Sequence, residues 1–383
     1  MRIAVVHSFY SSRVPSGENQ VVLAQVEALR AEGHEVALVA RHTDERLARA
    51  SYPVEAALTT ATGVGPDPTA ELAAFVPDVV HVHNLFPNFG TGWLRDWPGR
   101  IVATLHNFRP MCANGYLFRD GAPCTACPSG DRWGAVRHGC FHGSRVASLP
   151  LAWRGRHGVS ADPLLARADA IVVLSERARR TYADAGVGAE RLHVVPNFVT
   201  AGATPTTTVG DRWLCIARLT PEKGVLELVR SWPTGVGLDI VGEGALRAEI
   251  EDALLQVGAP DGVRLLGGMD NAALREAMGG YAGLVVPSRW FEGLPTVYLE
   301  ALAAGVPVLA VDGNSAADDV AAHDLGVVTS SSPTTAELQA GIDDVLARGE
   351  GCAARRRRRS ARASPRRPGA RRSRRCTTGP RWR

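Results

Sequence analysis

The sequence predicts an α/β protein with two doubly wound parallel sheets that face one shared cleft. The length of 383 residues is that of about two domains. Short apolar runs alternate with segments of helical spacing in both halves of the chain. A segment rich in Gly, Thr and Pro, residues 200–211, separates the halves. Because repeated strand–helix units build parallel sheets, ligands are expected outside the carboxyl ends of the strands.

The first half contains six apolar runs that each predict a buried strand. They are IAVVHSF (3–9), HEVALVA (34–40), DVVHVHN (78–84), IVATLHN (101–107), AIVVLS (170–175) and RLHVVPNF (191–198). Residues 19–33 have apolar side chains at helical spacing at Val22, Val26 and Leu29, and Gly33 is expected to end that helix. We therefore expect a first domain over residues 1–197.

The second half repeats the pattern. Strands are predicted at RWLCIARL (212–219), GLDIVGEG (237–244), VRLLGG (263–268), GLVVPS (283–288) and PVLAV (307–311), with helices at GVLELVRSW (224–232) and ALREAMGGY (273–281). Pro295 suits the first turn of a further helix, because its missing N–H has no partner to lose there. A second domain is therefore expected over residues 198–350.

Composition limits the classes of protein that fit. The chain is 45% hydrophobic and 21% charged, as in ordinary globular proteins. Its apolar runs are shorter than the roughly 18 residues of a membrane-spanning helix, and the start MRIAVVHSFY is too short for a signal-peptide core. Seven cysteines without a secretion signal argue against a disulfide framework. We therefore expect a cytoplasmic protein.

The last 33 residues, 351–383, differ from the rest of the chain. They contain 14 Arg and no Asp or Glu, so the formal charge of +4 leaves the remainder of the chain at −10. An acidic body argues against nucleic acid as a specific partner. The tail has the composition of a shifted reading frame in GC-rich DNA, and the rival interpretation is a disordered basic arm. Neither interpretation gives it a packed core.

Two pairs of charged residues follow predicted strands of the second half. Arg218 and Lys223 lie just past a strand and at the start of a helix, where fixed cations and helix N–H groups favour a diphosphate. Lys223 is also the single lysine of the chain. Glu292 and Glu300 flank the helix start at Pro295, itself a place that attracts anions. This arrangement of two carboxylates around an anion site requires an explanation.

The chain resembles the family 4 retaining glycosyltransferases of the GT-B fold over residues 1–345. The resemblance rests on ARLTPEKG, on VGEG and above all on the E-x7-E pattern of FEGLPTVYLEALAAGVPVLA. PDVVHVHN, ATLHN and VVPNFV match the first-half pattern of the family as well. The SGEN loop, residues 16–19, departs from the commoner Gly-Gly-x-Glu.

The resemblance implies an enzyme that transfers a hexosyl group from a nucleoside-diphosphate sugar to an acceptor hydroxyl. In it, Glu292 would accept hydrogen bonds from hydroxyls of the transferred sugar and Glu300 would hold the nucleotide ribose. The phosphates would lie on backbone N–H groups near Gly293, Leu294 and Thr296. Each carboxylate then faces hydroxyl donors, which is what a buried carboxylate needs.

The resemblance also implies how the leaving group departs. Arg218 and Lys223 would neutralise the departing diphosphate, so that no metal is required, and His106 would contact the donor sugar near the reacting carbon. Retention without a carboxylate nucleophile implies a front-face mechanism. The remaining donor-binding residues implied in this way are Gly17, Gly242 and Gly244.

A cysteine-rich insertion is expected at residues 107–145. Four cysteines within 29 residues could form a structural zinc site, and free thiols or an occasional disulfide are the alternative. The predicted ligands are Cys112, Cys124, Cys127 and Cys140, with His138 and His142 as alternatives.

Two other functions compete with transfer of a sugar. One is a GT-B sugar-nucleotide epimerase, although such enzymes normally lack this E-x7-E block. The other is a nucleotide-binding product that is catalytically impaired, because family members usually have a bracing last helix where the arginine tail stands here. The sequence does not name the sugar, the base or the acceptor. The resemblance implies peripheral contact with the inner face of a membrane as the setting for lipid-linked acceptors.

Overall fold

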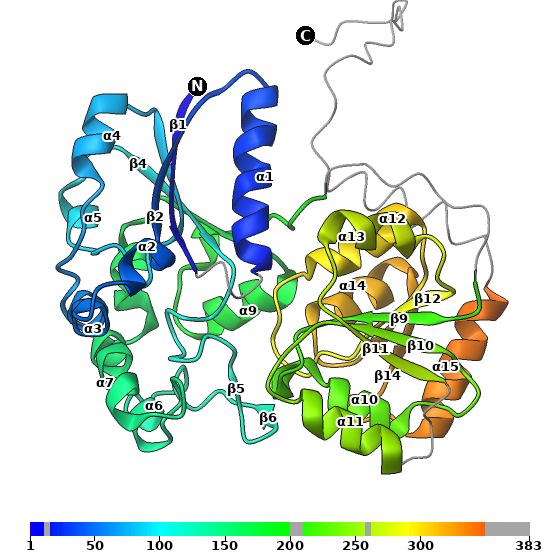
Figure 1. Ribbon diagram of the computed structural model, residues 1–383. Coiled ribbons are helices and arrows are strands. Elements are labelled where there is room, and N and C mark those ends of the chain that lie inside the picture. The colour runs from blue at the N-terminus through cyan, green and yellow to red at the C-terminus, as the bar shows by residue number, and fades with distance from the viewer. Residues whose placement is uncertain (11–15, 200–209, 257–261, 349–383) are drawn as a thin grey trace, which may run out of the picture.

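The computed structural model describes residues 1–10, 16–199, 210–256 and 262–348. They form two α/β units that lie side by side, each with a six-stranded sheet at its centre (Figure 1). Both six-stranded sheets are parallel throughout. The fold class predicted from the sequence is therefore confirmed.

The first sheet has the strand order β2-β1-β3-β4-β7-β8. Its strands are β1 Arg2–Phe9, β2 Glu35–His42, β3 Val79–Asn84, β4 Arg100–Leu105, β7 Ala170–Val173 and β8 Leu192–Val194. Seven of the eight residues of β1 are buried, because a parallel sheet is covered on both faces and its strands are apolar on both sides.

Helices surround this sheet and join its strands. They are α1 Gly17–Ala31, α2 Thr43–Leu47, α3 Tyr52–Thr62, α4 Thr69–Phe75, α5 Trp93–Asp96, α6 Gly134–Arg137, α7 Arg145–Arg154, α8 Pro163–Arg167 and α9 Glu176–Asp184. The predicted first helix is present as α1, which the Ser16 side chain caps by accepting a hydrogen bond from the Asn19 N–H. The cysteine-rich insertion holds a short antiparallel pair, β5 Phe118–Arg119 and β6 Ala122–Pro123.

The second sheet has the order β11-β10-β9-β12-β13-β14. Its strands are β9 Trp213–Ile216, β10 Leu238–Val241, β11 Val263–Gly267, β12 Gly283–Val286, β13 Val308–Val311 and β14 Gly326–Thr329. Its helices are α10 Val225–Ser231, α11 Arg247–Gln256, α12 Asn271–Met278, α13 Thr296–Ala304, α14 Ser315–His323 and α15 Thr335–Ala347. The sequence analysis missed β14, whose four residues at the sheet edge are only half-buried and give a weak apolar signal.

The loop between β12 and α13 crosses from the second unit to the first. Trp290 of this loop is 5% exposed and belongs to the hydrophobic core of the first unit. Its ring meets the Tyr116 ring edge to face, with centroids 5.0 Å apart. The two units are thus joined at the loop that carries Glu292.

The predicted linker and the arginine tail lie mostly or wholly outside the described residues, so the domain boundaries and the nature of the tail stay predictions. Within the described ranges, no helix has both the length and the apolar character needed to cross a bilayer.

Candidate functional site

The carboxyl ends of strands from both sheets meet where the two units touch. His106 follows β4, Arg218 follows β9, and Glu292 lies in the loop after β12. A Cβ atom added to Gly293 would lie 3.6 Å from the His106 carbonyl oxygen and 3.1 Å from a methyl carbon of Leu174. The structure therefore brings His106 of the first unit against the Glu292 loop of the second, as expected for parallel sheets that share a cleft.

Lys223 and Glu292 form an ion pair inside this junction. The Lys223 ammonium donates to Glu292 Oε1, and the two side chains are only 14% and 11% exposed. The same ammonium lies 5.3 Å from the centre of the Trp290 ring, a favourable cation–π position. Glu292 Oε2 is buried and accepts no hydrogen bond within the described residues. A buried carboxylate oxygen of this kind is ready to accept from a ligand hydroxyl.

Arg218 reaches the same junction from the end of β9. Its guanidinium donates to the Tyr116 hydroxyl at 3.3 Å and to Glu222 at 3.2 Å. Burial opposes the charge on Arg218, but Tyr116 and Glu222 outweigh it and raise the pKa of Arg218. Sequence reasoning missed Tyr116, because it lies in the cysteine-rich insertion and no motif marks it.

Gly242 and Gly244 pack against the loop that carries Arg218. A Cβ atom at Gly242 would come 1.9 Å from the Ala217 carbonyl oxygen, and one at Gly244 would come 2.4 Å from that of Leu219. Only glycine allows such a close approach of two backbones. These two glycines thus shape the Arg218 loop, and their predicted contact with the donor stays a prediction.

Two helix N-termini face each other across the junction. Helix α13 begins at Thr296, and its N-cap residue Pro295 supplies no side-chain hydrogen bond. A Cβ atom at Gly17, the first residue of α1, would lie 3.7 Å from the Thr296 hydroxyl oxygen. Because helix N-termini present free N–H groups and partial positive charge, this place favours an anion.

The other residues predicted at this helix start lie close by. Leu294 is buried, and its carbonyl oxygen accepts a hydrogen bond from the Asn197 side chain of the first unit at 3.3 Å. Glu300 lies one turn into α13, where burial raises its pKa and the charge of Arg275 opposes the rise. Their roles toward the phosphates and the ribose stay predictions.

His106 is one of four histidines packed at the ends of β1, β3 and β4. Its Nε2 lies 2.8 Å from His83 Nδ1, and the ring centres are 5.2 Å apart. Burial lowers the pKa of His106 to about 3 and those of His7 and His81 to about 4, and it holds the pKa of His83 well below its ordinary value. His106 is therefore neutral near pH 7 and can serve as a hydrogen-bonding group rather than as a cation.

A buried carboxylate next to Gly17 also belongs to this side of the junction. Glu18 accepts a hydrogen bond from the Asn107 side chain at 3.2 Å, and its other carboxylate oxygen is buried without a partner among the described residues. Burial raises the pKa of Glu18 to about 7, against the opposing charge of Arg109. The SGEN loop gave a signal for Glu18, but the sequence analysis used only Gly17.

The four cysteines of the insertion gather around one small cavity of about 10 Å³. All four are free thiols, and the described residues contain no group of three or more His, Cys, Asp or Glu that could hold a metal ion. Burial raises the pKa of the Cys127 thiol to about 12. The structure therefore does not support the predicted structural zinc, and His138 and His142 do not line the cavity.

A larger cavity of about 200 Å³ lies between the insertion and residues 151–160. Arg109, Arg132 and His157 line it, together with Cys112 and Cys127. None of the residues predicted to bind the donor lines this cavity.

Comparison with protein families covers most of the chain. Residues 15–201 match Glycosyltransferase Family 4, and residues 210–364 match Glycosyl transferases group 1. The two matches fall on the first and the second unit respectively.

Curated relatives match over shorter stretches. An exopolysaccharide phosphotransferase of Streptomyces coelicolor is 31% identical over 182 residues, which are 44% of this chain and 19% of the relative. A GDP-mannose-dependent α-(1-6)-phosphatidylinositol monomannoside mannosyltransferase of Mycobacterium tuberculosis is 32% identical over 127 residues, 30% of this chain and 33% of the relative. The chain thus spans from 19% to 33% of the length of these relatives.

Solved structures match over nearly the whole chain. A sucrose-phosphate synthase from Thermosynechococcus elongatus has a TM-score of 0.65 at 18% identity and covers 94% of both chains. Anabaena HepE in complex with UDP and glucose has a TM-score of 0.60 at 15% identity, covering 95% of this chain and 94% of that one. These likenesses show the shared two-sheet GT-B fold. By the two family matches, this chain belongs to family 4 of the glycosyltransferases.

Proposed function

We propose that the protein is a retaining glycosyltransferase that moves a sugar from a nucleoside-diphosphate sugar to an acceptor hydroxyl. The observation that carries this proposal is the buried Lys223–Glu292 pair, whose carboxylate keeps one oxygen without a partner among the described residues. The uncapped start of α13 lies in the same loop region. A cation, a free carboxylate oxygen and a helix N-terminus are together suited to a sugar diphosphate.

In the proposed reaction, the bond between the anomeric carbon of the sugar and the diphosphate oxygen breaks, and its electron pair stays on the diphosphate. Arg218 and Lys223 stabilise this developing charge, and positioned groups of this kind contribute ~3–4 kcal/mol each. The acceptor oxygen bonds to the anomeric carbon on the same face, and its proton passes to a phosphate oxygen. Because the two side chains supply the positive charge, the proposal requires no divalent ion for the transfer.

The remaining site residues orient the donor. Glu292 accepts hydrogen bonds from the sugar hydroxyls and Glu300 from the ribose hydroxyls, while backbone N–H groups at Gly293 and Thr296 hold the phosphates. Neutral His106 offers a hydrogen bond near the reacting carbon. The contact between Gly293 and the backbone of His106 supports this placement, because both residues then border one donor site.

Calorimetric titration with UDP and with GDP, each without metal, tests the donor site. We expect one of them to bind, and Glu300→Ala to weaken that binding about tenfold, because the loss of hydrogen bonds to a charged acceptor costs ~1.5–3 kcal/mol. Glu337→Ala, a capping glutamate of α15 away from the site, is the control and should bind normally. Both bases are tested because the two relatives cited above name GDP-mannose in one case and UDP in the other.

Two outcomes of the titration, and two of a turnover assay with sugar donors, have different meanings. Binding of one nucleotide that Glu300→Ala weakens supports the donor site, and unchanged binding in that variant overturns the role of Glu300. Nucleotide binding without release of nucleotide from any sugar donor would favour the impaired product. Conversion of the donor to its epimer would favour the epimerase.

We also propose that the first unit contacts an anionic membrane surface through the outer face of α3 and α7. These two helices pack against each other, and α3 exposes Val54 and Leu58. On α7, Val146, Leu149 and Trp153 are 81%, 47% and 46% exposed and share one face by their spacing of three and four residues. The exposed Arg145 lies beside them, and the Arg156 guanidinium lies 4.3 Å from the centre of the Trp153 ring. An apolar helix face bordered by arginines is complementary to anionic lipid.

Vesicle flotation tests this surface. We expect the protein to float with vesicles that contain phosphatidylglycerol but not with phosphatidylcholine alone, and Leu149→Asp to abolish flotation by placing a carboxylate in the apolar face. Leu255→Asp, at a residue 74% exposed on α11 of the second unit, is the matched control and should still float. Equal flotation of the two variants, or a wild-type dimer that Leu149→Asp dissociates, would overturn the membrane assignment.

A further inference from the structure

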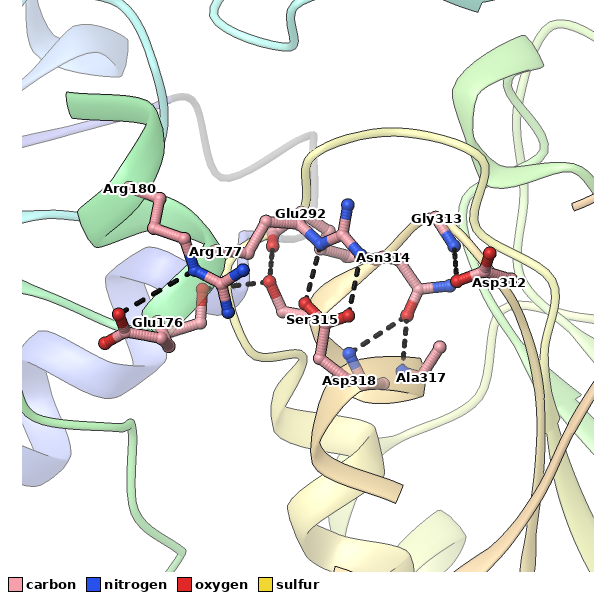
Figure 2. A network of polar contacts seen from close by, with 12 residues as sticks. Glu176, Arg177, Arg180, Glu292, Asp312, Gly313, Asn314, Ser315, Ala317 and Asp318 are labelled. Carbon is pink, nitrogen blue, oxygen red and sulfur yellow. Dashed lines mark hydrogen bonds and ion pairs between the residues drawn. The ribbon is translucent and has the colours of Figure 1, made fainter. Parts of the chain in front are cut away.

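A chain of hydrogen bonds runs from the first unit to the backbone of Glu292. It begins at Ser175, the N-cap of α9, whose hydroxyl oxygen accepts from the Ala178 N–H at 3.1 Å. The Ser175 and Ser315 hydroxyl oxygens are 2.9 Å apart. Ser315 Oγ lies 2.5 Å from the Glu292 carbonyl oxygen (Figure 2). Ser175 is 9% exposed and Ser315 is 2% exposed, so water does not compete for these bonds.

The direction of this chain is fixed by its two ends. The backbone N–H of Ala178 can only donate, and the carbonyl oxygen of Glu292 can only accept. Each serine has a single hydroxyl proton, so Ser175 donates to Ser315 and Ser315 donates to Glu292. Every hydroxyl then donates once and accepts once, which leaves no proton position free to vary.

The start of α14 holds Ser315 in place. The Asn314 side chain donates to the Ser288 and Val311 carbonyl oxygens at 2.8 Å each, and its oxygen accepts from the N–H groups of Ala316 and Ala317. Asn314 is fully buried and uses its whole hydrogen-bonding capacity, and Figure 2 shows its oxygen accepting from the N–H group of Ala317. The backbone that carries Ser315 is therefore held in place by contacts within the second unit.

An ion pair joins the same two elements. Arg177 of α9 donates through Nε and Nη2 to both carboxylate oxygens of Asp318 on α14, at 2.7 and 2.6 Å. Such a two-point contact fixes orientation as well as distance. Figure 2 shows this pair beside Ser315, so the start of α9 is positioned directly against the start of α14.

We propose that Ser315 and Ser175 are positioning residues that hold the Glu292 loop in its reactive placement, and that contact between the two units strengthens this hold through Ser175. The inference deepens the proposed function and rests on it for the role of Glu292. Neither serine needs to touch the substrate, because Ser315 acts on the backbone of Glu292 while the carboxylate faces the ligand. Separation of the units would remove Ser175 from Ser315 and leave the bond from Ser315 to Glu292, so the loop would be held less firmly in the open enzyme than in the closed one.

Hydrogen exchange of the full-length protein tests the coupling without any ligand. We expect Ser315→Ala to speed amide exchange in residues 291–296 by about two- to tenfold, the range for loss of one buried hydrogen bond. Ser175→Ala should speed it as well, and by less, because the bond from Ser315 to Glu292 remains. Ser148→Ala, which removes an equally buried serine hydroxyl within α7, is the control and should leave these amides unchanged. Unchanged exchange in Ser315→Ala would overturn the inference even if transferase activity were never found.

A double-mutant cycle on release of nucleotide from UDP-glucose and from GDP-mannose gives the second readout. Ser315→Ala is expected to lower kcat about tenfold with a smaller loss of affinity for the free nucleotide, and to add little in a Glu292→Gln background. Equal losses in both backgrounds would mean that Ser315 acts independently of Glu292, which overturns the inference. A wild-type protein that binds no donor would count against the proposed function, and the exchange result would then decide the positioning role alone.

Discussion

Replacing Lys223 by methionine is expected to lower kcat by about 10²- to 10³-fold, the size of effect seen when one positioned charge stabiliser is removed. The ammonium is 14% exposed and is held between Glu292 and the Trp290 ring, so water replaces its charge poorly. The charge is needed most when the diphosphate departs, so turnover should fall more than donor affinity. Release of nucleotide from the sugar donor, measured at saturation, checks the expectation.

The Lys223 variant has a structural side effect that must be separated from catalysis. Removing the ammonium leaves the Glu292 carboxylate buried without its partner, and an unpaired buried charge destabilises the fold. The double variant Lys223→Met, Glu292→Gln removes both charges, so it should recover thermal stability but not activity. Arg247→Ala, a surface cation paired with Glu243 and Glu251, is the control and should keep full activity. A Lys223 variant with normal kcat would exclude the proposed role.

Replacing Glu292 by glutamine is expected to lower kcat about 100-fold while the affinity for the free nucleotide changes less than about twofold. The amide has the shape of the carboxylate, but an NH2 group replaces one of the two oxygens. This group donates hydrogen bonds and cannot accept one from a sugar hydroxyl. Free nucleotide lacks the transferred sugar that Glu292 contacts, so its binding should depend on Glu300, the helix start and the cations instead. Parallel titrations with the sugar nucleotide and with the nucleotide alone measure the two affinities.

A matched change controls for loss of an ion pair. Glu251→Gln removes a carboxylate that pairs with Arg247 on the surface of α11, and both affinities and kcat should stay at wild-type values. If Glu292→Gln weakened nucleotide and sugar nucleotide equally, the carboxylate would belong to the nucleotide site rather than to the sugar site.

Much of the fold could be predicted from local patterns. Buried parallel strands give continuous apolar runs, and helices give apolar residues three or four positions apart, so β1 and α1 were predicted from residues close in the chain. The edge strand β14 was not predicted, because its residues are only half-buried and a half-buried strand needs fewer apolar side chains. Local patterns are therefore most reliable for elements that are buried on both faces.

The site could be predicted only where its residues lie in short motifs. Lys223 and Glu292 lie 69 positions apart and were identified separately, each from its own strand–loop–helix segment. Their pairing in one buried contact depends on how β9 and β12 lie next to each other in the sheet. The cysteine pattern shows the reverse case, because suitable spacing alone predicted a zinc site that the described residues do not form.

The sequence by itself determined the two strand–helix halves, the glutamate pair around the start of α13 and the cations after β9, because these features depend on spacings along a few turns of chain. Tertiary structure alone decided that Trp290 packs in the core of the first unit, that Tyr116 contacts Arg218, and that Ser175 reaches Glu292 through Ser315. The physical reason is distance along the chain, because a contact between residues more than a hundred positions apart forms only when both units have folded and docked. The spacing of apolar residues within one helix or strand does not depend on such a contact and cannot predict it.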